Sequence, residues 1–279
     1  MGEHGATGRA LSAADGGGER GVVPMDASAG EWLSTHVVAS APLHPASGLC
    51  LLTLAAAPRS RAGQHVRLRP ADLAGPPRYY SLASAPAEPA QILVAPARDG
   101  GSFDPALLAA GDALQVSAEA AGRLVLDDAR GRALWLFGAG TGIAPLRAMV
   151  RHGQGLAGFE RVVVVHGARD HARLAFFAEL SAAAAGSAGR MRYLTLLTGV
   201  HDAGDGADVS ALPGRRGRIP AAIAADWLEG AAAAPLDASA VAVVCGPPAM
   251  VADTVAALQR LGLRLADESA GPGQIITER

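Results

Sequence analysis

The chain has 279 residues, enough for one large domain or two of ordinary size, and 50% of them are hydrophobic, so a core can form without cross-links. Its 24 cationic residues are all arginine, and a formal net charge of −2 gives no overall attraction to nucleic acid or to an anionic membrane. Two cysteines, Cys50 and Cys245, are too few to ligate an iron–sulfur cluster, and no C-x-x-C pair indicates a zinc site. A disulfide between them is left open, and a reducing compartment is the default.

The first 30 residues are rich in Gly and Ala and contain no continuous apolar core like that of a secretory signal. We therefore expect residues 1–30 to form a disordered tail. Elsewhere, no stretch combines the length and the hydrophobicity of a membrane-spanning helix. These features predict a soluble, cytoplasmic protein, which we expect to be a monomer.

Between residues 31 and 130 the sequence is typical of short strands separated by turns. The expected strands cover residues 31–40, 48–56, 63–70, 78–84, 90–97 and 112–118. Six strands at this spacing, with breaks rich in Gly and Pro between them, predict a small antiparallel β-barrel or sandwich.

From residue 131 to residue 279 the pattern changes to strands that alternate with helices. The expected strands cover residues 132–140, 161–170, 191–199 and 240–244, and the expected helices cover residues 144–153, 174–185, 219–230 and 250–262. Nearly continuous Val- and Leu-rich strands in such an alternation predict an α/β domain with a doubly wound parallel sheet. The sequence therefore predicts two domains with a boundary near residue 130.

The segment RYYS at residues 78–81 is unusual because aromatic residues make up only 4% of the chain. One interpretation is a half-buried β-strand, since alternation of this kind forms one face of a sheet. The other is a surface for a flat, charged ligand, with Arg78 and the two tyrosines in contact with it. These four residues do not decide between the two interpretations.

The segment GAGTGIAP at residues 138–145 follows an expected strand and begins an expected helix. Glycines there allow a phosphate to approach the backbone, and the helix N-terminus offers free N–H groups. Ile143 stands where the third glycine of G-x-G-x-x-G would fall, so the ordinary dinucleotide fingerprint is absent. A structural turn without a ligand is an equal interpretation, although Thr141 and Pro145 favour a binding turn.

Two further segments follow expected strands. HGARD at residues 166–170 places Arg169 where an arginine accommodates the 2′-phosphate of NADP, and a solvated arginine would give the same pattern. CGPPAM at residues 245–250 places Cys245 at a strand end, where it is either a small buried residue or a group that faces a reaction centre.

Together these segments resemble the ferredoxin–NADP reductase superfamily. RYYS fits its R-x-Y-S flavin motif, GAGTGIAP fits its nicotinamide-pyrophosphate turn, and CGPPAM fits its C-terminal C-G-x-P motif. Within the superfamily the chain looks most like the bacterial ferredoxin/flavodoxin–NADP reductases, and the resemblance covers about residues 31–279. It implies an FAD-binding β-barrel domain over residues 31–130 and an NADP-binding α/β domain over residues 131–279.

The resemblance also implies roles for individual residues. Arg78 would contact the FAD pyrophosphate, Tyr80 would stack on the isoalloxazine, and Ser81 would lie near flavin N5. The implied cofactor-binding residues are Arg78, Tyr79, Tyr80, Ser81, Val94, Ser102, Phe103, Gly140, Thr141, Gly142, Ala168, Arg169, Thr198, Arg218, Cys245, Gly246 and Pro247. The implied catalytic residues are Tyr80, Ser81, Cys245 and Glu278, and no metal site is implied.

The activity that the resemblance implies is hydride transfer from NADPH to FAD, followed by single-electron transfer to ferredoxin or flavodoxin. Arg59, Arg61, Arg67 and Arg69 could steer a small acidic carrier, although scattered solvated arginines explain this group equally well. Two alternatives are an NADH-dependent reductase component of an oxygenase system and a non-catalytic regulator that binds flavin or nucleotide.

Thr198 and Gly199 depart from the family pattern, because relatives tend to have Ser or Thr followed by Arg at this point. The missing arginine weakens the expected preference for NADP over NAD, which Arg215 or Arg216 could restore.

Two further departures concern the flavin. Asp104 replaces a serine near the FAD phosphates, so we expect Ser102 to donate to them instead. Relatives continue beyond the position of Glu278 with a residue that covers the flavin, often an aromatic one. We therefore expect an open flavin face, weaker FAD retention and a faster reaction with O₂.

Overall fold

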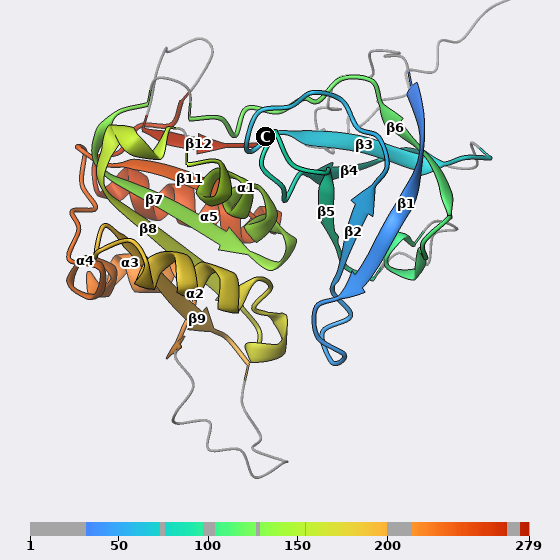
Figure 1. Cartoon of the computed structure of the whole chain (residues 1–279). Coiled ribbons are helices and arrows are strands. Elements are labelled where there is room, and N and C mark those ends of the chain that lie inside the picture. The colour runs from blue at the N-terminus through green and yellow to red at the C-terminus, as the bar shows by residue number, and fades with distance from the viewer. Residues whose placement is uncertain are drawn as a thin grey trace, which may run out of the picture.

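The computed structural model describes residues 32–72, 76–96, 104–126, 129–153, 155–199, 214–266 and 274–278. The predicted tail at residues 1–30 lies outside the described residues, as do two of the predicted cofactor-binding residues, Ser102 and Phe103. The chain forms two sheets that lie side by side, an antiparallel one and a parallel one (Figure 1).

The first sheet contains the six strands expected from the sequence. They are β1 (Trp32–Pro42), β2 (Cys50–Leu54), β3 (His65–Pro70), β4 (Arg78–Ser81), β5 (Gln91–Val94) and β6 (Ala113–Ser117). Their order is β4-β3-β6-β1-β2-β5, and every pairing is antiparallel. A bridge between Leu82 and Ile92 joins the two edges, so the sheet is nearly closed into a barrel.

Alternating apolar residues fill the interior of this barrel, because successive side chains of a strand point to opposite faces. Val37, Leu52, Leu68, Ile92 and Val116 are all completely buried there. The predicted antiparallel barrel is therefore confirmed.

The second sheet is parallel and has the order β10-β9-β8-β7-β11-β12. Its strands are β7 (Gly131–Ala139), β8 (Phe159–Ala168), β9 (Met191–Leu197), β10 (Arg215–Arg216), β11 (Val241–Cys245) and β12 (Ile275–Thr277). Val162 to Val165 are at most 3% exposed, because helices cover both faces of the sheet.

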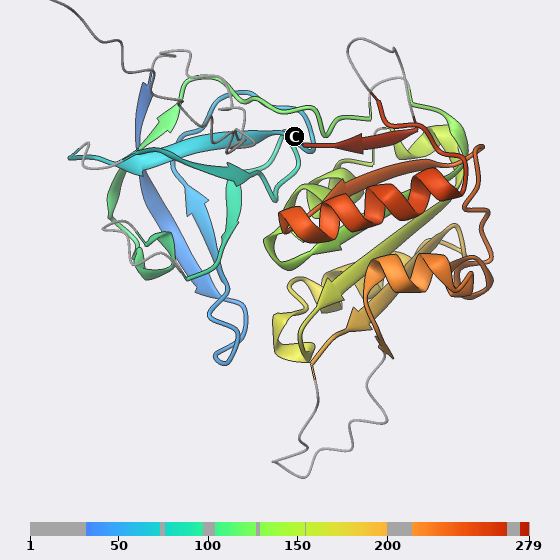
Figure 2. The same ribbon diagram turned by 180° about the vertical axis from the view of Figure 1, so that it is seen from behind.

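Within the described ranges, five α-helices cover this sheet. They are α1 (Ile143–His152), α2 (Phe177–Ala185), α3 (Ile219–Ala224), α4 (Trp227–Ala232) and α5 (Pro248–Arg260). Helices α1 and α2 pack on one face, and α3, α4 and α5 pack on the other, which Figure 2 shows from behind. This arrangement confirms the predicted doubly wound α/β fold.

The single helix expected over residues 219–230 is wrong in detail. The chain forms α3 and α4 instead, with Asp226 between them in the left-handed region at φ 50°. The break redirects the chain so that Ile223 and Leu228 both pack into the same core cluster. The structure also adds β10 and β12, which have only two and three residues and lack a recognisable alternation of their own.

The barrel and the α/β half share a packed interface. Leu49, Ala83 and Leu93 of the barrel join the buried cluster beneath α1 and α2. Arg147 of α1, only 5% exposed, donates across the interface to the carbonyl oxygen of Ala83 and to Gln91 Oε1, each at 2.9 Å. The two halves are therefore held in a defined relation by apolar contacts and by a buried guanidinium.

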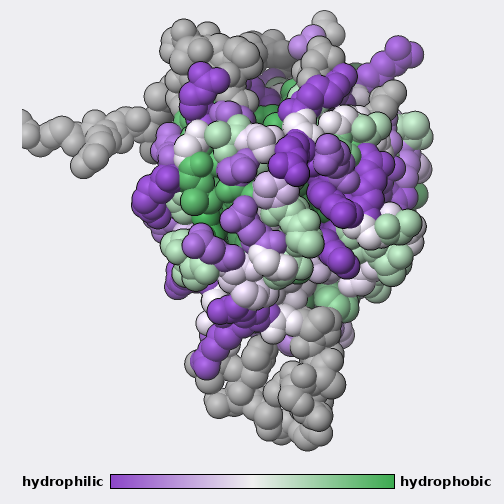
Figure 3. Space-filling view, turned by 90° about the vertical axis from the view of Figure 1, so that its left-hand side faces the viewer, coloured by the Kyte–Doolittle hydropathy of each residue, from purple (hydrophilic) through white to green (hydrophobic). Residues whose placement is uncertain are grey.

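The far face of the α/β half, turned away from the barrel, carries hydrophilic residues interspersed with smaller apolar groups (Figure 3). None of the helices in the described ranges is long and apolar enough to cross a membrane. Cys50 and Cys245 are both free thiols, so the disulfide left open by the sequence is not formed.

Candidate functional site

The parallel strands all end at one edge of the second sheet. The direction in which the chain adds strands to this sheet reverses at β7. From β7 the chain continues through β8 and β9 on one side, whereas β11 lies on the other side of β7. Open α/β sheets bind ligands at such a switch point, outside the carboxyl ends of the strands. This edge faces the barrel (Figure 1), and the predicted segments after β7, β8, β9 and β11 all lie along it.

The glycine turn after β7 lies directly against the turn after β11. A Cβ on Gly142 would come within 2.3 Å of the carbonyl oxygen of Cys245, so no larger residue fits there without a shift of the backbone. Gly140 has a φ of 57°, and a Cβ there would have no atom within 4 Å. Glycine is therefore needed at 142 for close approach and at 140 for backbone conformation.

The helices α1 and α5 both begin at this switch point. Neither has a side chain that caps its N-terminus, where Gly142 and Pro247 are the cap residues. The N-termini of the two helices carry the positive ends of the helix dipoles, although the N–H of Ile143 already donates to the carbonyl oxygen of Gly140 and Pro248 has no N–H. Such an edge fits a ligand that carries phosphate groups.

Arginines gather at the outer part of the same edge. Arg169, Arg215, Arg216 and Arg218 are all exposed there. The guanidinium of Arg215 lies 4.7 Å from the ring centroid of Trp227, which limits its range of positions. The cluster provides the positive charge that a further phosphate group requires.

Gly199, which replaces an expected arginine, is held close to Arg169. Its N–H donates to the carbonyl oxygen of Arg169 at 2.6 Å, and a Cβ on Gly199 would come equally close, 2.6 Å, to that oxygen. A side chain at position 199 would therefore require the backbone of Gly199 or Arg169 to shift.

The segment RYYS forms β4, an edge strand in the order of the first sheet, so the strand interpretation holds. Tyr80 is half-buried against the barrel core, and Arg78 shares its face because the two residues are two apart. Ser81 lies opposite His65 in the β3–β4 register, and Tyr79, which is 41% exposed, faces the same side. The two faces of β4 thus offer different groups: a guanidinium and a phenol on one, and a hydroxyl and a second phenol on the other.

Cys245 and Glu278 meet at the end of the second sheet nearest to the barrel. Burial, with a smaller contribution from the charge of Glu278, raises the pKa of Cys245 from 9.0 to about 12, so this residue is a neutral thiol. The hydroxyl of Thr277 donates to the carbonyl oxygen of Val244 at 2.9 Å, which fixes the segment that carries Glu278.

The remaining predicted residues of the α/β half lie at the carboxyl edge. Thr141, Thr198 and Pro247 are exposed there, and Ala168 ends β8 with 9% of its surface exposed. The backbone N–H of Thr198 donates to the carbonyl oxygen of Ala168 at 3.0 Å, which holds these two strand ends together.

In the barrel, two residues that the sequence placed near the cofactor, Val94 and Asp104, make other contacts in the structure. The side chain of Val94 is completely buried in the barrel core, so a cofactor could reach only its backbone. The carboxylate of Asp104 accepts a hydrogen bond from the N–H of Ala106 at 3.0 Å and caps the short 3₁₀ helix Pro105–Leu107. This contact satisfies Asp104 locally.

One residue of this region was missed by sequence reasoning. His65 is 8% exposed, and its ring lies edge-on to that of Tyr79, with 5.6 Å between centroids. Its Nδ1 lies 3.7 Å from Oε1 of Glu278. A histidine in place of an apolar residue at the start of a predicted strand was the only available signal.

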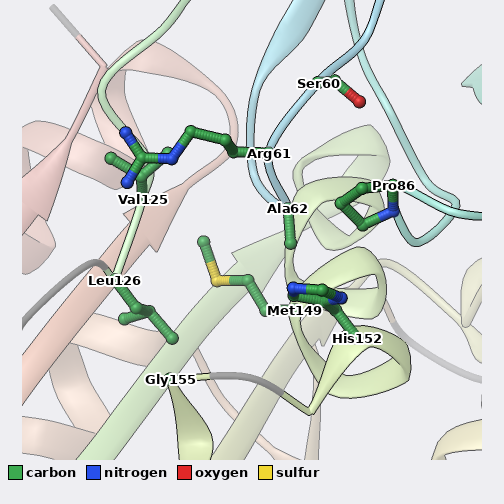
Figure 4. Close-up of a pocket in the computed structure, with 9 residues that line it drawn as sticks. All are labelled: Ser60, Arg61, Ala62, Pro86, Val125, Leu126, Met149, His152 and Gly155. Carbon is green, nitrogen blue, oxygen red and sulfur yellow. The ribbon is translucent and has the colours of Figure 1, made fainter.

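A pocket of about 370 Å³ lies between the barrel and the far end of α1 (Figure 4). Arg61 and Ala62 line it from the loop before β3, and Met149 and His152 line it from the last turns of α1. Because α1 rises about 1.5 Å per residue, this end lies more than 10 Å from the glycine turn. The pocket is therefore separate from the candidate site.

Comparisons with known proteins agree with this geometry. The family described as "Oxidoreductase NAD-binding domain" matches residues 136–256, from β7 into α5. Over 219 residues the chain is 32% identical to ferredoxin–NADP reductase A of Sorangium cellulosum, which covers 74% of this chain and 75% of that protein. The chain belongs to the ferredoxin/flavodoxin–NADP reductase family.

Two further similarities support the assignment. The chain is 33% identical over 181 residues to flavodoxin/ferredoxin–NADP reductase of Shigella flexneri, with coverage of 63% of this chain and 69% of that protein. The crystal structure of a ferredoxin–NADP⁺ reductase from Neisseria gonorrhoeae, with bound FAD and NADP, matches with a TM-score of 0.76 at 24% identity. That match covers 88% of this chain and 98% of the other and shows the same fold. The resemblance seen in the sequence motifs is confirmed, and the protein is an oxidoreductase of this family.

Proposed function

We propose that this reductase binds FAD along β4 and NADP(H) at the carboxyl edge of the second sheet, and transfers electrons from NADPH to a ferredoxin or flavodoxin. Flavin supplies the chemistry, because it accepts two electrons as hydride and can release them one at a time. The observation that carries the proposal is the contact between Gly142 and Cys245 at the switch point, next to Glu278 and to the barrel.

The residues of β4 fit an extended dinucleotide. Arg78 carries a guanidinium that pairs bidentately with a diphosphate, and Tyr80 offers a ring face on which a flat heterocycle can stack. Ser81 lies on the other face of β4, on the side of His65 and Glu278, where its hydroxyl can donate to a ring nitrogen. We assign these three residues to FAD.

The edge of the second sheet fits the nicotinamide nucleotide. The turn from Gly140 to Gly142 and the uncapped start of α1 suit its pyrophosphate, and Arg169 and Arg218 suit a 2′-phosphate. Cys245, as a neutral thiol, adds no charge next to a nicotinamide ring. These assignments follow the charge and the shape of each part of the edge.

The carrier is assigned to the outer face of β3. Arg67 and Arg69 lie 5.3 and 4.0 Å from the ring centroid of Trp32, and Nε of Arg69 donates to Gln115 Oε1 at 2.8 Å. These two arginines lie on the same face of β3 as His65. Their positive charge therefore extends along β3, from the candidate site at His65 outward. Arg61 lines the separate pocket instead, which divides the predicted arginine group into two.

An anaerobic titration of the purified protein with NADPH, followed in the visible spectrum, tests the proposal. We expect NADPH to bleach the absorption of a bound flavin, and a ferredoxin or flavodoxin added afterwards to restore it. Colourless protein, or a flavin that NADPH does not bleach, would contradict the proposal.

The choice of nicotinamide cofactor is tested by removing one arginine. In Arg218→Ala we expect the KM for NADPH to rise about tenfold and the KM for NADH to stay unchanged, because only NADPH has the 2′-phosphate. Arg192→Ala is the matched control, since Arg192 is also exposed but lies at the opposite end of β9. Equal effects on both cofactors would contradict this role.

Gly199 favours a second candidate, an NADH-dependent reductase that serves an oxygenase. The backbone contact between Gly199 and Arg169 leaves no space for a further phosphate-binding side chain. The ratio of kcat/KM for NADPH to that for NADH separates the two candidates: a value well below one favours the oxygenase-linked enzyme.

A further inference from the structure

The turn after β11 is packed tightly against the glycine turn after β7. A Cβ on Gly142 would lie 2.6 Å from the Cα of Gly246 and 2.3 Å from the carbonyl oxygen of Cys245. Gly246 itself has a φ of 154°, a conformation that residues with side chains rarely adopt. The two turns therefore share one close contact, and a displacement of Gly246 would also displace the residues on either side of it.

Met250, in the first turn of α5, fills the space next to Gly246. A Cβ on Gly246 would lie 2.4 Å from Cε of Met250, 3.0 Å from the carbonyl oxygen of Ala139 and 3.3 Å from the backbone nitrogen of Ala139. The methyl group of Met250 therefore packs against the bare face of Gly246, beside the end of β7. Methionine suits such an irregular gap because its side chain is long, unbranched and flexible.

A second contact holds the sulfur of Met250. Thr254, one turn further along α5, is completely buried, and its hydroxyl donates to Sδ of Met250 at 3.3 Å. The side chain of Met250 also packs against the core cluster that α3, α4 and α5 share. A side chain that is held at its sulfur has few rotamers left for its terminal methyl group. The methyl group thus supports Gly246 from a defined place.

We propose that Met250 is a positioning residue, which acts through Gly246 to hold Cys245 and the glycine turn in their relative places at the switch point. The inference rests on the proposed function, in which the nicotinamide lies next to Cys245. Hydride transfer is sensitive to displacements of about 1 Å between the reacting groups. Loss of the support should therefore slow the transfer more than it weakens the binding of the nucleotide.

Chemical modification of Cys245 tests the proposal without any turnover. In Met250→Ala the helix should persist, because alanine is the best helix former, but Gly246 loses its support. We expect iodoacetamide to alkylate Cys245 at least about fivefold faster than in the wild type, because a looser turn exposes the thiol. Peptide mass spectrometry reads each cysteine separately. Cys50, which is 4% exposed in the barrel core, is the internal reference and should react as slowly as in the wild type.

Two variants separate support of the turn from general loosening of the fold. Val255→Ala truncates another side chain of α5 that packs against the same core cluster, about 7.5 Å further along the helix, and it should leave the alkylation of Cys245 unchanged. Met250→Leu keeps most of the side-chain volume and should stay within about twofold of the wild type. An unchanged rate in Met250→Ala would overturn the proposal, as would an equal rise in Val255→Ala or at Cys50.

The second measurement is the anaerobic reduction of the flavin by NADPH. In Met250→Ala we expect the rate at saturating NADPH to fall about tenfold, and the half-saturating concentration to change less than about threefold. Binding should suffer less because the 2′-phosphate is assigned to Arg169 and Arg218, at the outer part of the edge. A variant that binds NADPH more weakly but keeps the saturated rate of the wild type would overturn the positioning role.

The two measurements also separate this inference from the proposed function. If NADPH does not reduce the flavin of the wild type, the proposed function fails. The alkylation of Cys245 then still decides whether Met250 supports the turn.

Discussion

Removal of Arg147 should destabilise the protein far more than removal of its neighbour on the same helix. Nε of Arg147 contacts both carboxylate oxygens of Glu179, at 3.0 and 2.9 Å, and Nη1 donates to Ala83 and Gln91 at 2.9 Å. Its guanidinium also lies 4.3 Å from the ring centroid of Phe176. Truncation to alanine removes all of these contacts from a position that is 5% exposed.

The cost can be worked out from these contacts. The carbonyl oxygen of Ala83 and the amide oxygen of Gln91 would each lose a donor, at about 1 kcal/mol apiece. Loss of the charge-assisted contact with Glu179 adds about 1.5 kcal/mol, because that carboxylate keeps Arg151 as a partner at 2.9 Å. Contact with the Phe176 ring adds up to about 1 kcal/mol. We expect a loss of about 4 kcal/mol for Arg147→Ala.

Urea unfolding followed by tryptophan fluorescence measures this loss. Arg151→Ala is the matched control: its side chain is 35% exposed and pairs near the surface with Glu88 and Glu179, so its loss should cost only about 1 kcal/mol. Because Arg147 joins the two halves, its loss should also split the single transition into two. A loss below about 1.5 kcal/mol, or one equal to that of Arg151→Ala, would refute the importance of the buried guanidinium.

Three further outcomes follow from the described contacts. Gly142→Ala should weaken NADPH binding at least about tenfold in a fluorescence titration, because its Cβ would lie 2.3 Å from the Cys245 carbonyl oxygen; an unchanged Kd would contradict this. Cys245 has a pKa of about 12, so at pH of about 8 iodoacetamide should alkylate it of the order of a thousand times more slowly than a free thiol, as read by mass spectrometry. Burial lowers the pKa of His166 from 6.5 to about 3, so its contribution to stability is present above pH 6.5 and is lost as the pH falls. His166→Leu should therefore make the free energy of unfolding less sensitive to acid between pH 6.5 and 4, and equal sensitivity would show that His166 is protonated without cost.

The fold was predictable where hydrophobic periodicity is strong. The run from Val162 to Val165 reads as a strand buried on both faces, and the structure confirms it. The break at Asp226 was not predictable, because residues 219–230 have uninterrupted helical propensity and only packing against the common core favours two helices. Strands as short as β10 and β12 form because longer neighbours bind them, which no local pattern records.

The candidate site was predictable to the extent that motifs follow strands. Carboxyl ends of parallel strands share an edge, so Gly142 and Cys245 could be expected near each other, although the roles of the site residues stay predictions. The alternation of β4 could have shown that Tyr80 and Ser81 face opposite sides. The approach of His65 to Glu278 could not be foreseen, because it depends on the β3–β4 register and on the end of β12, which lie more than 200 residues apart in sequence.

The buried polar contacts of Glu278, His65 and Arg147 lie at the interface between the two halves, and the arrangement of the halves explains why. Glu278 comes from the second sheet, His65 from the barrel and Arg123 from the linker, so their contacts exist only when both halves are correctly placed. Transfer between bound groups is sensitive to displacements of about 1 Å, so a site divided between two sheets needs a rigid connection. The buried contacts of Arg147 and the apolar cluster shared by α1 and the barrel supply that connection on the far side of the interface. Arg147, which lies outside the candidate site, therefore helps to hold the two halves in the relation that the proposed site requires.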